Sequence, residues 1–479
     1  MESEGHWASG YVTEIEYTFG YYRELSPGIL RLACLSAGFV PPPQPLNYLE
    51  LGFGQGLSIN IHAAASDGEF WGTDFNPAQV AHARATAEAA GSGARLYEQS
   101  FAEFAERPDL PEFDIIGLHG IWTWISDQNG RIIVDLIRRK LKAGGIVYIS
   151  YNCFPGWAPS VPLRHLMKLH ADYAAESSGM LAKLDGAVNF AQQVIDSGAF
   201  FFRGNPAVVE RLKRMSAMNR NYLAHEFFTH DWRVMPFSDV ARWLEDAKLS
   251  FAASAHLLDH VEAVNLSEAG QKLLAGIGHP ILRQSVRDYL VNQQFRRDIF
   301  SKGTRRLTGL EQAELLRQQA FILLAHQDDI PMKVAGSLGE ATLSEEVYRP
   351  LISALADANY SAKTVNQLVI HPKLSSIPFS QIVQGLLVLT GAGFAHPAEE
   401  PSKRARTRCS TLNRYLCEKA RSSSNVLFLA SPVCATGVLV TQFQQLALLA
   451  AQEGRRTPDD QAKFVWGLLA AQGQRLTKD

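Results

Sequence analysis

The sequence predicts an α/β protein built on a doubly wound parallel sheet, and three observations in its N-terminal third support this fold class. Short apolar segments alternate with segments of helical periodicity, which is the pattern of repeated β-α-β units. Residues 113–119 form a nearly continuous apolar run, as in a strand that is buried on both faces. A glycine-rich turn at residues 52–56 stands between a strand and a helix. Parallel sheets bind ligands at such turns.

The other elements of this block follow from capping and turn signals. Asn76 and Pro77 start a helix that Gly91 ends, because Asn caps helices and Pro is favoured at their first position. The remaining helices are expected at residues 26–38, 57–65 and 127–141. Strands are expected at residues 47–51, 69–74, 94–98, 113–119 and 146–151. Five strands separated by helices predict a parallel sheet.

The alternation of strands and helices stops after the fifth strand. Residues 159–228 carry helical signals only, whereas a helix at 238–247 and a strand at 249–256 would rejoin the sheet. We therefore expect a sheet domain at 1–158 and 229–262, a helical lid insertion at 159–228, a helical middle domain at 263–340 and a winged-helix-like C-terminal domain at 341–479.

Composition narrows the class of protein. The 479 residues suggest about three domains. The formal charge of −2 gives no reason to expect a nucleic-acid partner. The five cysteines are odd in number and form no Cys-x-x-Cys pair, which favours a reducing cytoplasm. The N-terminal residues 1–6 have no basic or apolar region, so no secretory signal is expected.

One long uncharged stretch, residues 422–452, raises the question of a membrane span. Ser431 and Pro432 interrupt it, as do Thr436 and Gly437, so its unbroken apolar pieces are too short to cross a bilayer. We expect two strands, at 426–430 and 438–441, followed by a helix from residue 442. No membrane association is expected.

The glycine turn carries the strongest chemical signal. Its pattern is G-x-G-x-G, and Leu57 stands where a dinucleotide-binding loop would need a further glycine. Glu50 precedes the loop, and a carboxylate there suits a cationic amino group better than a pyrophosphate. Asp74 ends the second strand, where a carboxylate can accept both hydroxyls of a ribose.

Further polar and aromatic residues follow these strands. Phe75 could lie against an adenine, and the residues after the third strand could border its edge: Gln99, Ser100 and Phe101. Leu141-Lys142-Ala143-Gly144-Gly145 leads into the fifth strand. Together with the glycine loop and Asp74, these motifs resemble the class I S-adenosylmethionine-dependent methyltransferases, with their Rossmann-like sheet.

Three unusual segments narrow the resemblance. Residues 113–124, 148–157 and 221–228 look like bacterial methyltransferases that carry a methyltransferase regulatory domain. That family includes protein-lysine methyltransferases acting on bacterial surface proteins. The similarity covers about residues 10–300 well, and the C-terminal third more loosely.

The resemblance implies S-adenosylmethionine as cofactor and S-adenosylhomocysteine as product. The cofactor-binding residues would be Glu50, Gly52, Gly54, Gly56, Asp74, Phe75, Gln99, Ser100, Phe101, His119 and Tyr21. Tyr21 and Tyr22 belong to the aromatic run 17–22, and either of them would cap the sulfonium by a cation–π contact, unless the run only packs on the surface of the sheet. The catalytic candidates are His119, Trp122, Tyr151 and Asn152. His119, Trp122, Trp124 and Tyr151 would form an aromatic-walled channel that lowers the pKa of an acceptor lysine by desolvation.

Several alternatives stay open at this stage. His119 could instead be a buried structural histidine, and Trp122 a core residue. The acceptor could be a small molecule or a glycan instead of a protein. The chain could also be a cofactor-binding regulatory or scaffold protein that acts through its C-terminal module. A homodimer is equally open.

Two motifs are set aside. The histidines 225 and 230 stand at spacing i, i+5, whereas a helical zinc pair needs i, i+4, so no metal is expected. His225 and Glu226 would instead attach the lid to the sheet domain. The basic cluster at 403–408 is expected to be a solvated loop rather than a DNA contact.

Overall fold

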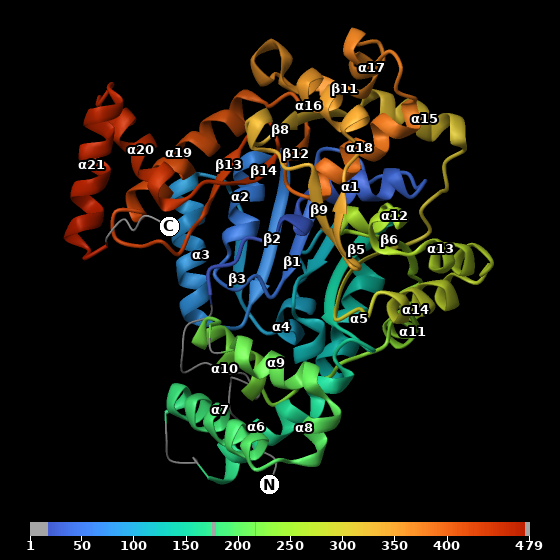
Figure 1. Cartoon of the computed structure of the whole chain (residues 1–479). Helices are drawn as coiled ribbons and strands as arrows, with labels where there is room; N and C mark the ends of the chain where they lie inside the picture. Colours follow the sequence, from blue (N-terminus) through green and yellow to red (C-terminus); the bar gives the residue numbers. More distant parts are fainter. Residues whose placement is uncertain (1–17, 175–178, 216, 475–479) are drawn as a thin grey trace.

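A twisted seven-stranded sheet occupies the centre of the computed structural model, which describes residues 18–174, 179–215 and 217–474 (Figure 1). Its strands are β1 (Leu46–Leu51), β2 (Gly68–Asp74), β3 (Arg95–Glu98), β4 (Phe113–Leu118), β5 (Leu141–Asn152), β6 (Ser250–Ser254) and β7 (Phe295–Ser301). Their order is β3-β2-β1-β4-β5-β7-β6. The fold class that the sequence predicts is confirmed. Residues 1–6, where no secretory signal is expected, lie outside the described part of the chain.

Helices cover both faces of the sheet. One face packs against α1 (Pro27–Ser36), α2 (Leu57–Ala65) and α3 (Pro77–Ala90). The other face packs against α4 (Phe101–Ala105), α5 (Asp127–Lys140) and α11 (Phe237–Glu245). Every residue of β4 is buried, as its continuous apolar sequence predicts. In β1, Tyr48 packs on the first face and Leu49 on the second, because strand residues alternate sides.

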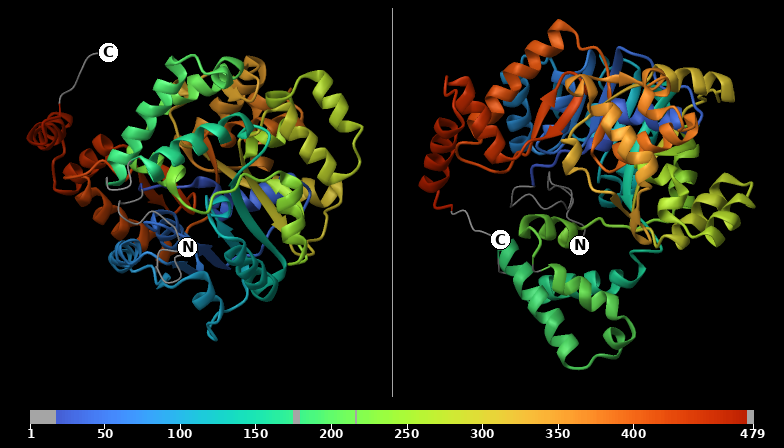
Figure 2. Two further views of the ribbon diagram at one scale, coloured as in Figure 1. Left: turned by 90° about the horizontal axis from the view of Figure 1, so that it is seen from below. Right: turned by 45° about the horizontal axis from the view of Figure 1, so that its top comes forward.

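The lid is a helical insertion between β5 and α11. It comprises α6 (Val161–Tyr173), α7 (Met180–Asp196), α8 (Phe200–Gly204), α9 (Pro206–Met215) and α10 (Arg220–Phe228). These helices have a small apolar core of their own, which includes Met167, Ala187, Leu212 and Phe227. Figures 1 and 2 show the lid in green beyond one end of the central sheet.

The structure corrects the expected extent of the sheet, which continues past residue 262. The seventh strand, β7, lies inside the segment expected to be purely helical and pairs antiparallel with both β5 and β6. Its sequence hides it, because three consecutive residues are charged: Arg296, Arg297 and Asp298. Arg296 and Asp298 are buried and form an ion pair with each other, so the strand is internal despite its polarity.

The expected boundary at residue 341 is also wrong, because a small antiparallel sheet crosses it. Its strand order is β11-β8-β12, with β8 (Ala320–Leu323) between β11 (Lys363–Thr364) and β12 (Ala395–Ala398). The helices of this middle region are α12 (Glu262–Asn265), α13 (Glu268–Ala275), α14 (Pro280–Leu290), α15 (Gly309–Gln318), α16 (Glu345–Tyr360), α17 (Val365–Val369) and α18 (Phe379–Gly391). A hairpin joins β9 (Lys333–Gly336) to β10 (Gly339–Thr342).

The C-terminal module packs on the outer side of α2 and α3 (Figure 1). It contains α19 (Lys403–Lys419), the hairpin β13 (Phe428–Ser431) and β14 (Thr436–Leu439), α20 (Gln442–Gln452) and α21 (Pro458–Ala471). The hairpin and α20 confirm the interpretation of the uncharged stretch. Among the described residues, no helix has the length and apolar character that a membrane crossing requires.

The basic cluster at 403–408 is not a loop, because it forms the first turns of α19. Arg408 is buried and donates hydrogen bonds to two carbonyl oxygens at the end of α2, at 3.3 Å to Ala64 and 2.6 Å to Ser66. Arg406 pairs with Glu400 on the exposed side. The five cysteines are all buried free thiols.

Candidate functional site

A cavity of about 430 Å³ lies at the carboxyl ends of the central strands, and residues of the lid helices α9 and α10 form part of its lining. This volume falls in the usual range for small-molecule sites, about 300–1,000 Å³. Seven of the residues expected at the site line it: Glu50, Gly52, Gly54, Asp74, Phe75, His119 and Asn152. They come from β1, the glycine loop, β2, β4 and β5, so the sheet topology brings together residues that are up to a hundred positions apart.

Glu50 is a buried carboxylate that faces this cavity. In the described part of the chain its one hydrogen bond comes from the Tyr48 hydroxyl, at 3.2 Å. Burial raises the pKa of Glu50 to about 8, although the Tyr48 bond acts in the opposite direction. A buried acid with so little compensation is suited to a cationic ligand group, since a positive charge would offset its desolvation.

Asp74 and the glycine loop form the second part of the cavity. The Asp74 carboxylate accepts hydrogen bonds from the backbone amides of Gly54, at 2.8 Å, and Asn76, at 2.9 Å. Burial raises the pKa of Asp74 to about 6, and these amide bonds moderate the rise. Gly52 and Gly54 have positive φ angles, +68° and +57°, which lets the loop turn sharply between β1 and α2.

Five of the expected cofactor residues do not line the cavity: Gly56, Gln99, Ser100, Phe101 and Tyr21. A Cβ on Gly56 would meet the Ala83 Cβ at 2.4 Å, so this glycine serves the close packing of α2 on α3. Ser100 caps α4 in a reciprocal pair with Glu103. Gln99 accepts from Arg107 at 3.3 Å, and Phe101 packs on the sheet core. An adenine-bordering role for the segment 99–101 therefore has no support in the cavity lining.

His119 is held by aromatic rings and is electrically neutral. It stacks on Tyr22 with ring centroids 3.7 Å apart, and its Nδ1 lies 2.8 Å from the Tyr148 hydroxyl. Burial lowers the pKa of His119 to about 3. A histidine this acidic is a poor general base, so it serves as a wall of the cavity and as a hydrogen-bonding group.

Tyr22, rather than Tyr21, belongs to the cavity. The Tyr21 hydroxyl hydrogen-bonds to Thr436, accepts from the Gly437 amide at 2.9 Å and lies 3.1 Å from the His62 Nε2. Tyr21 thus faces the C-terminal hairpin, and the two adjacent tyrosines point in different directions.

Two of the expected catalytic residues are buried away from the cavity. The Tyr151 hydroxyl donates to Asp298 at 2.7 Å, on the face of β5 opposite Asn152. Trp122 packs edge-on against Trp243, with centroids 5.7 Å apart, in the core under α5 and α11. Trp124, two positions on, does line the cavity. The structure therefore favours the core interpretation of Trp122 and a structural one for Tyr151.

Asn152 contacts the lid at Glu226. The sequence predicts Glu226 as a residue that attaches the lid to the sheet domain, but not as a residue of the cavity. The Asn152 side-chain amide donates to the Glu226 carboxylate at 3.0 Å, and the Trp232 indole donates to the same oxygen at 3.4 Å. Glu226 is buried and lines the cavity from α10. Burial raises its pKa, while Trp232, Arg164, Arg211 and Asn152 oppose the rise.

Sequence reasoning had one available signal for Glu226 as a site residue. It is the single acid in the helix segment 222–228, which otherwise consists of apolar residues, aromatic residues and His225. An acid that is buried in such a segment needs a partner or a ligand, because unpaired acids are rarely buried. Arg211 on α9 and Tyr222 on α10 also line the cavity and were not expected there. His225 lines it as well, whereas His230 is exposed, so the two histidines are not directed to one site.

The carboxylates that line the cavity suit a ligand that carries an amino group and two adjacent hydroxyls. Glu50 offers a buried carboxylate to a cation, and Asp74 offers a second carboxylate at the next strand end. Phe75, Tyr22 and Trp124 supply flat apolar surfaces to the same cavity. S-adenosylmethionine has an amino group, a ribose, an adenine and a sulfonium, so the residues present fit it.

Two family models match the chain. One is described as a methyltransferase domain and matches residues 49–145, which contain Glu50, Asp74 and His119. The other is described as a predicted methyltransferase regulatory domain and matches residues 219–302, from the start of α10 to the end of β7. The second match therefore includes Glu226 together with the strand β7.

Comparisons with whole proteins agree with these matches. An uncharacterized protein of Synechocystis is 40% identical over 479 residues, which cover 99% of this chain and 93% of the relative. An uncharacterized protein of Rickettsia prowazekii is 25% identical over 221 residues, which cover 45% of this chain and 85% of the relative. PKMT2 from Rickettsia typhi, solved in complex with AdoHcy, aligns with a TM-score of 0.70 and 16% identity over 97% of this chain and 93% of that one. The same protein without ligand aligns with a TM-score of 0.68.

Proposed function

We propose that this chain, which belongs to the class I S-adenosylmethionine-dependent methyltransferases with a methyltransferase regulatory domain, methylates the side-chain amine of a protein lysine. S-adenosylmethionine is its cofactor and S-adenosylhomocysteine its product. When bound, the cofactor supplies a methyl group on a positively charged sulfur. The chain therefore has to hold the cofactor, orient the acceptor and exclude water.

Glu50 and Asp74 would hold the two ends of the cofactor's polar part. The Glu50 carboxylate would pair with the amino group of the methionine portion, and Asp74 would accept the ribose hydroxyls. Gly54 would let the ligand approach the backbone closely, since a Cβ there would meet only the Gln79 side chain, at 4.0 Å. At Gly52 the Ile121 side chain fills that space instead. Tyr22 and Phe75 would contact the apolar surfaces of the cofactor.

The observation that carries the lysine assignment is the buried Glu226. It lines the same cavity as the glycine loop, and Asn152 and Trp232 each donate a hydrogen bond to one of its oxygens. Burial raises the pKa of Glu226 in spite of Arg164 and Arg211, so a cationic acceptor is favoured, because its positive charge would offset the remaining cost of burying the carboxylate. Lysine is the protein side chain that is both cationic and nucleophilic once it loses a proton.

Glu226 would also help the amine to lose that proton. Lysine has an ordinary pKa near 10.4, so only about one amine in 10³ is neutral at pH 7. Burial raises the pKa of Glu226 and would lower the pKa of an entering lysine. The difference between the two pKa values therefore becomes smaller. Transfer of one proton from the ammonium to Glu226 leaves the nitrogen with the electron pair that methyl transfer needs.

The test combines product analysis with one isosteric variant. Purified protein is incubated with isotope-labelled S-adenosylmethionine and with separate protein and small-molecule fractions of the source cells. We expect label in methyllysine after hydrolysis of the protein fraction. For Glu226→Gln we expect kcat/KM to fall about 10- to 100-fold, in line with the roughly 1.5–3 kcal/mol of a charge-assisted hydrogen bond. The affinity of the Glu226→Gln protein for the cofactor, measured by calorimetry, should stay within about twofold of the wild-type value.

Label confined to the small-molecule fraction would overturn the lysine assignment and favour a small-molecule acceptor. Full activity of Glu226→Gln toward protein would remove Glu226 from the site while leaving lysine as the acceptor. The two results are separate, because one concerns the product and the other concerns the residue.

A further inference from the structure

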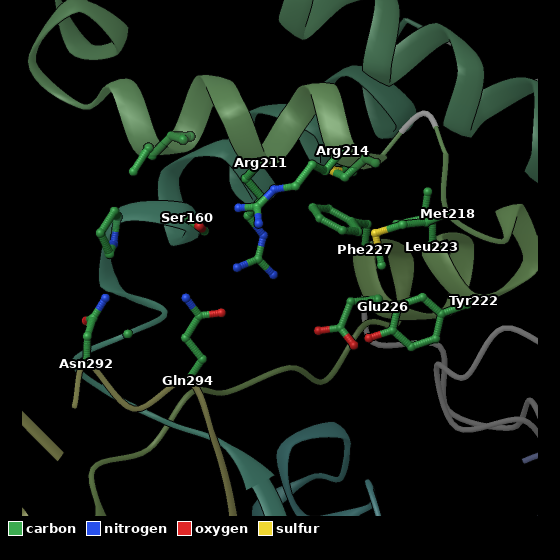
Figure 3. A pocket seen from close by; sticks show the side chains of 15 residues that line it. Ser160, Arg211, Arg214, Met218, Tyr222, Leu223, Glu226, Phe227, Asn292 and Gln294 are labelled. Atoms are coloured by element: carbon green, nitrogen blue, oxygen red, sulfur yellow. The ribbon is translucent and has the colours of Figure 1, made fainter. Parts of the chain in front are cut away.

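A second cavity, of about 290 Å³, lies between the lid and the loop before β7 (Figure 3). It shares four lining residues with the cofactor cavity: Arg211, Tyr222, Glu226 and Gln294. The two cavities therefore meet at Glu226. If the first cavity holds the cofactor, the second is the route by which an acceptor reaches it.

Two arginines face this second cavity from α9. Figure 3 shows the guanidinium groups of Arg211 and Arg214 between the helix and Gln294, on the opposite side from the Tyr222 ring. The Arg211 guanidinium also lies over the Trp157 ring, 3.7 Å from its centroid, which fixes its position. Arg211 lines both cavities, whereas Arg214 lines only the outer one.

Neither arginine forms an ion pair with an acid within the described residues. Burial lowers the pKa of Arg211, and the negative charge of the nearby Glu226 partly opposes this effect without a direct ion pair. The same helix does carry an acid, but Glu210 pairs with Lys213 at 2.8 Å on the exposed side. Two adjacent cations without a bonded anion repel each other, and such a pair is stabilised when a carboxylate binds between them.

We infer that an acidic residue stands two positions before or after the acceptor lysine, and that Arg211 and Arg214 bind its carboxylate while Glu226 receives the lysine ammonium. This inference rests on the proposed function. The charges are arranged in that order along the cavities: Glu226 and Arg211 at the junction, then Arg214 outside. Side chains two positions apart on an extended chain lie on the same side of it, about 6.6 Å apart, so an acidic side chain there can reach the arginines while the lysine enters the junction. Guanidinium groups bind carboxylates in bidentate geometry, which makes the selection specific.

A free amino acid would offer the same combination of amine and carboxylate, so the experiment includes it. The substrates are free lysine and three blocked peptides that contain one lysine. They differ only at the positions two residues before and two residues after that lysine, which carry Asp, Asn or Arg. We expect the Asp peptide to have a KM at least about tenfold below that of the Asn peptide, because truncating one partner of a buried charge pair costs roughly 30-fold or more in affinity. Arg214→Glu should reverse the preference, so that the Arg peptide becomes the best substrate.

Lys213→Gln is the matched control, since Lys213 is next in sequence but pairs with Glu210 on the exposed side of α9. It should keep the wild-type preference for the Asp peptide. Cofactor affinity, measured by calorimetry on every variant, checks that each protein is folded at the cofactor site.

Equal KM values for the three peptides, or an unchanged Asp preference in Arg214→Glu, would overturn the inference while leaving lysine methylation intact. Methylation of free lysine as efficient as that of the peptides would instead overturn the proposed protein acceptor. Absence of methyllysine in every peptide and in cell protein, with cofactor binding intact, would overturn the proposed function and this inference with it.

Discussion

At the scale of single residues, Glu50 links cofactor binding to pH. Its carboxyl is buried, and its pKa in the free protein is raised to about 8, so most molecules carry the proton at pH 7. A cationic amino group beside it favours the ionised form and lowers that pKa. Binding therefore releases a proton from Glu50 at neutral pH.

We predict that calorimetry at pH 7 shows the release of nearly one proton, about 0.9, when S-adenosylmethionine binds. The observed enthalpy would then differ between phosphate and Tris buffers. Because binding releases the proton, affinity should rise with pH from 6 to about 7.5, below the range near 7.7–8.0 where an α-amino group loses its own charge. Glu50→Gln should abolish the buffer dependence. Equal enthalpies in the two buffers would show that Glu50 is ionised before binding.

The sequence predicts correctly which residues lie at the strand ends. It does not predict to which side of the chain each side chain points. Glu50, Asp74, His119 and Asn152 follow or end strands, and the sheet topology brings them to one cavity. Adjacent residues in extended chain point to opposite sides, so the choice of Tyr21 over Tyr22 depended on a one-position register that the sequence does not reveal.

At the scale of elements, β7 explains why Tyr151 is a structural residue. Asp298 on β7 accepts one hydrogen bond from Tyr151 and another from Arg296, each at 2.7 Å. Arg296 pairs in addition with Asp288 from α14. This buried network stabilises the antiparallel pairing of β7 with β5, and β5 ends in Asn152 at the cavity.

We predict that Tyr151→Phe lowers the free energy of unfolding by about 1.5–3 kcal/mol, because a buried carboxylate loses one donor. The ring, which is packed in the core, is retained. Since Tyr151 does not line the cavity, kcat and KM should stay within about twofold of the wild type. Chemical denaturation and steady-state kinetics measure the two effects. A large fall in kcat with unchanged stability would restore Tyr151 to the mechanism.

The same strand shows the limit of sequence reasoning at this scale. The first five strands have apolar centres or short apolar segments and alternate with helices that Gly, Pro and Asn signals delimit, so their order along the chain predicts the parallel half of the sheet. β7 carries three charges in succession, which are compensated by partners that are distant in sequence: Asp288 and Glu24. Arg211, Arg214 and Glu226 escaped prediction for the same reason, since only tertiary packing brings the lid to the cavity.

At the scale of the whole molecule, the C-terminal module supports the cofactor half of the sheet domain. Helix α2 starts at the glycine loop, and its other end is held by Arg408 of α19. The hairpin of the same module surrounds the Tyr21 side chain, which is adjacent to the cavity residue Tyr22. Two elements of the cofactor cavity are thus attached to a module about 400 residues away in the sequence.

We predict that Arg408→Met, which keeps the apolar stem, weakens S-adenosylmethionine binding about three- to tenfold and lowers the free energy of unfolding by about 2–3 kcal/mol. The two carbonyl oxygens at the end of α2 would lose their buried donor, so the helix and the glycine loop that begins it would be held less firmly. Calorimetry and chemical denaturation measure the two quantities. Lys403→Gln is the control on the same helix, because its side chain is exposed, and it should change stability by less than about 0.5 kcal/mol. Loss of stability with unchanged cofactor affinity would mean that the module protects the fold without supporting the cofactor site.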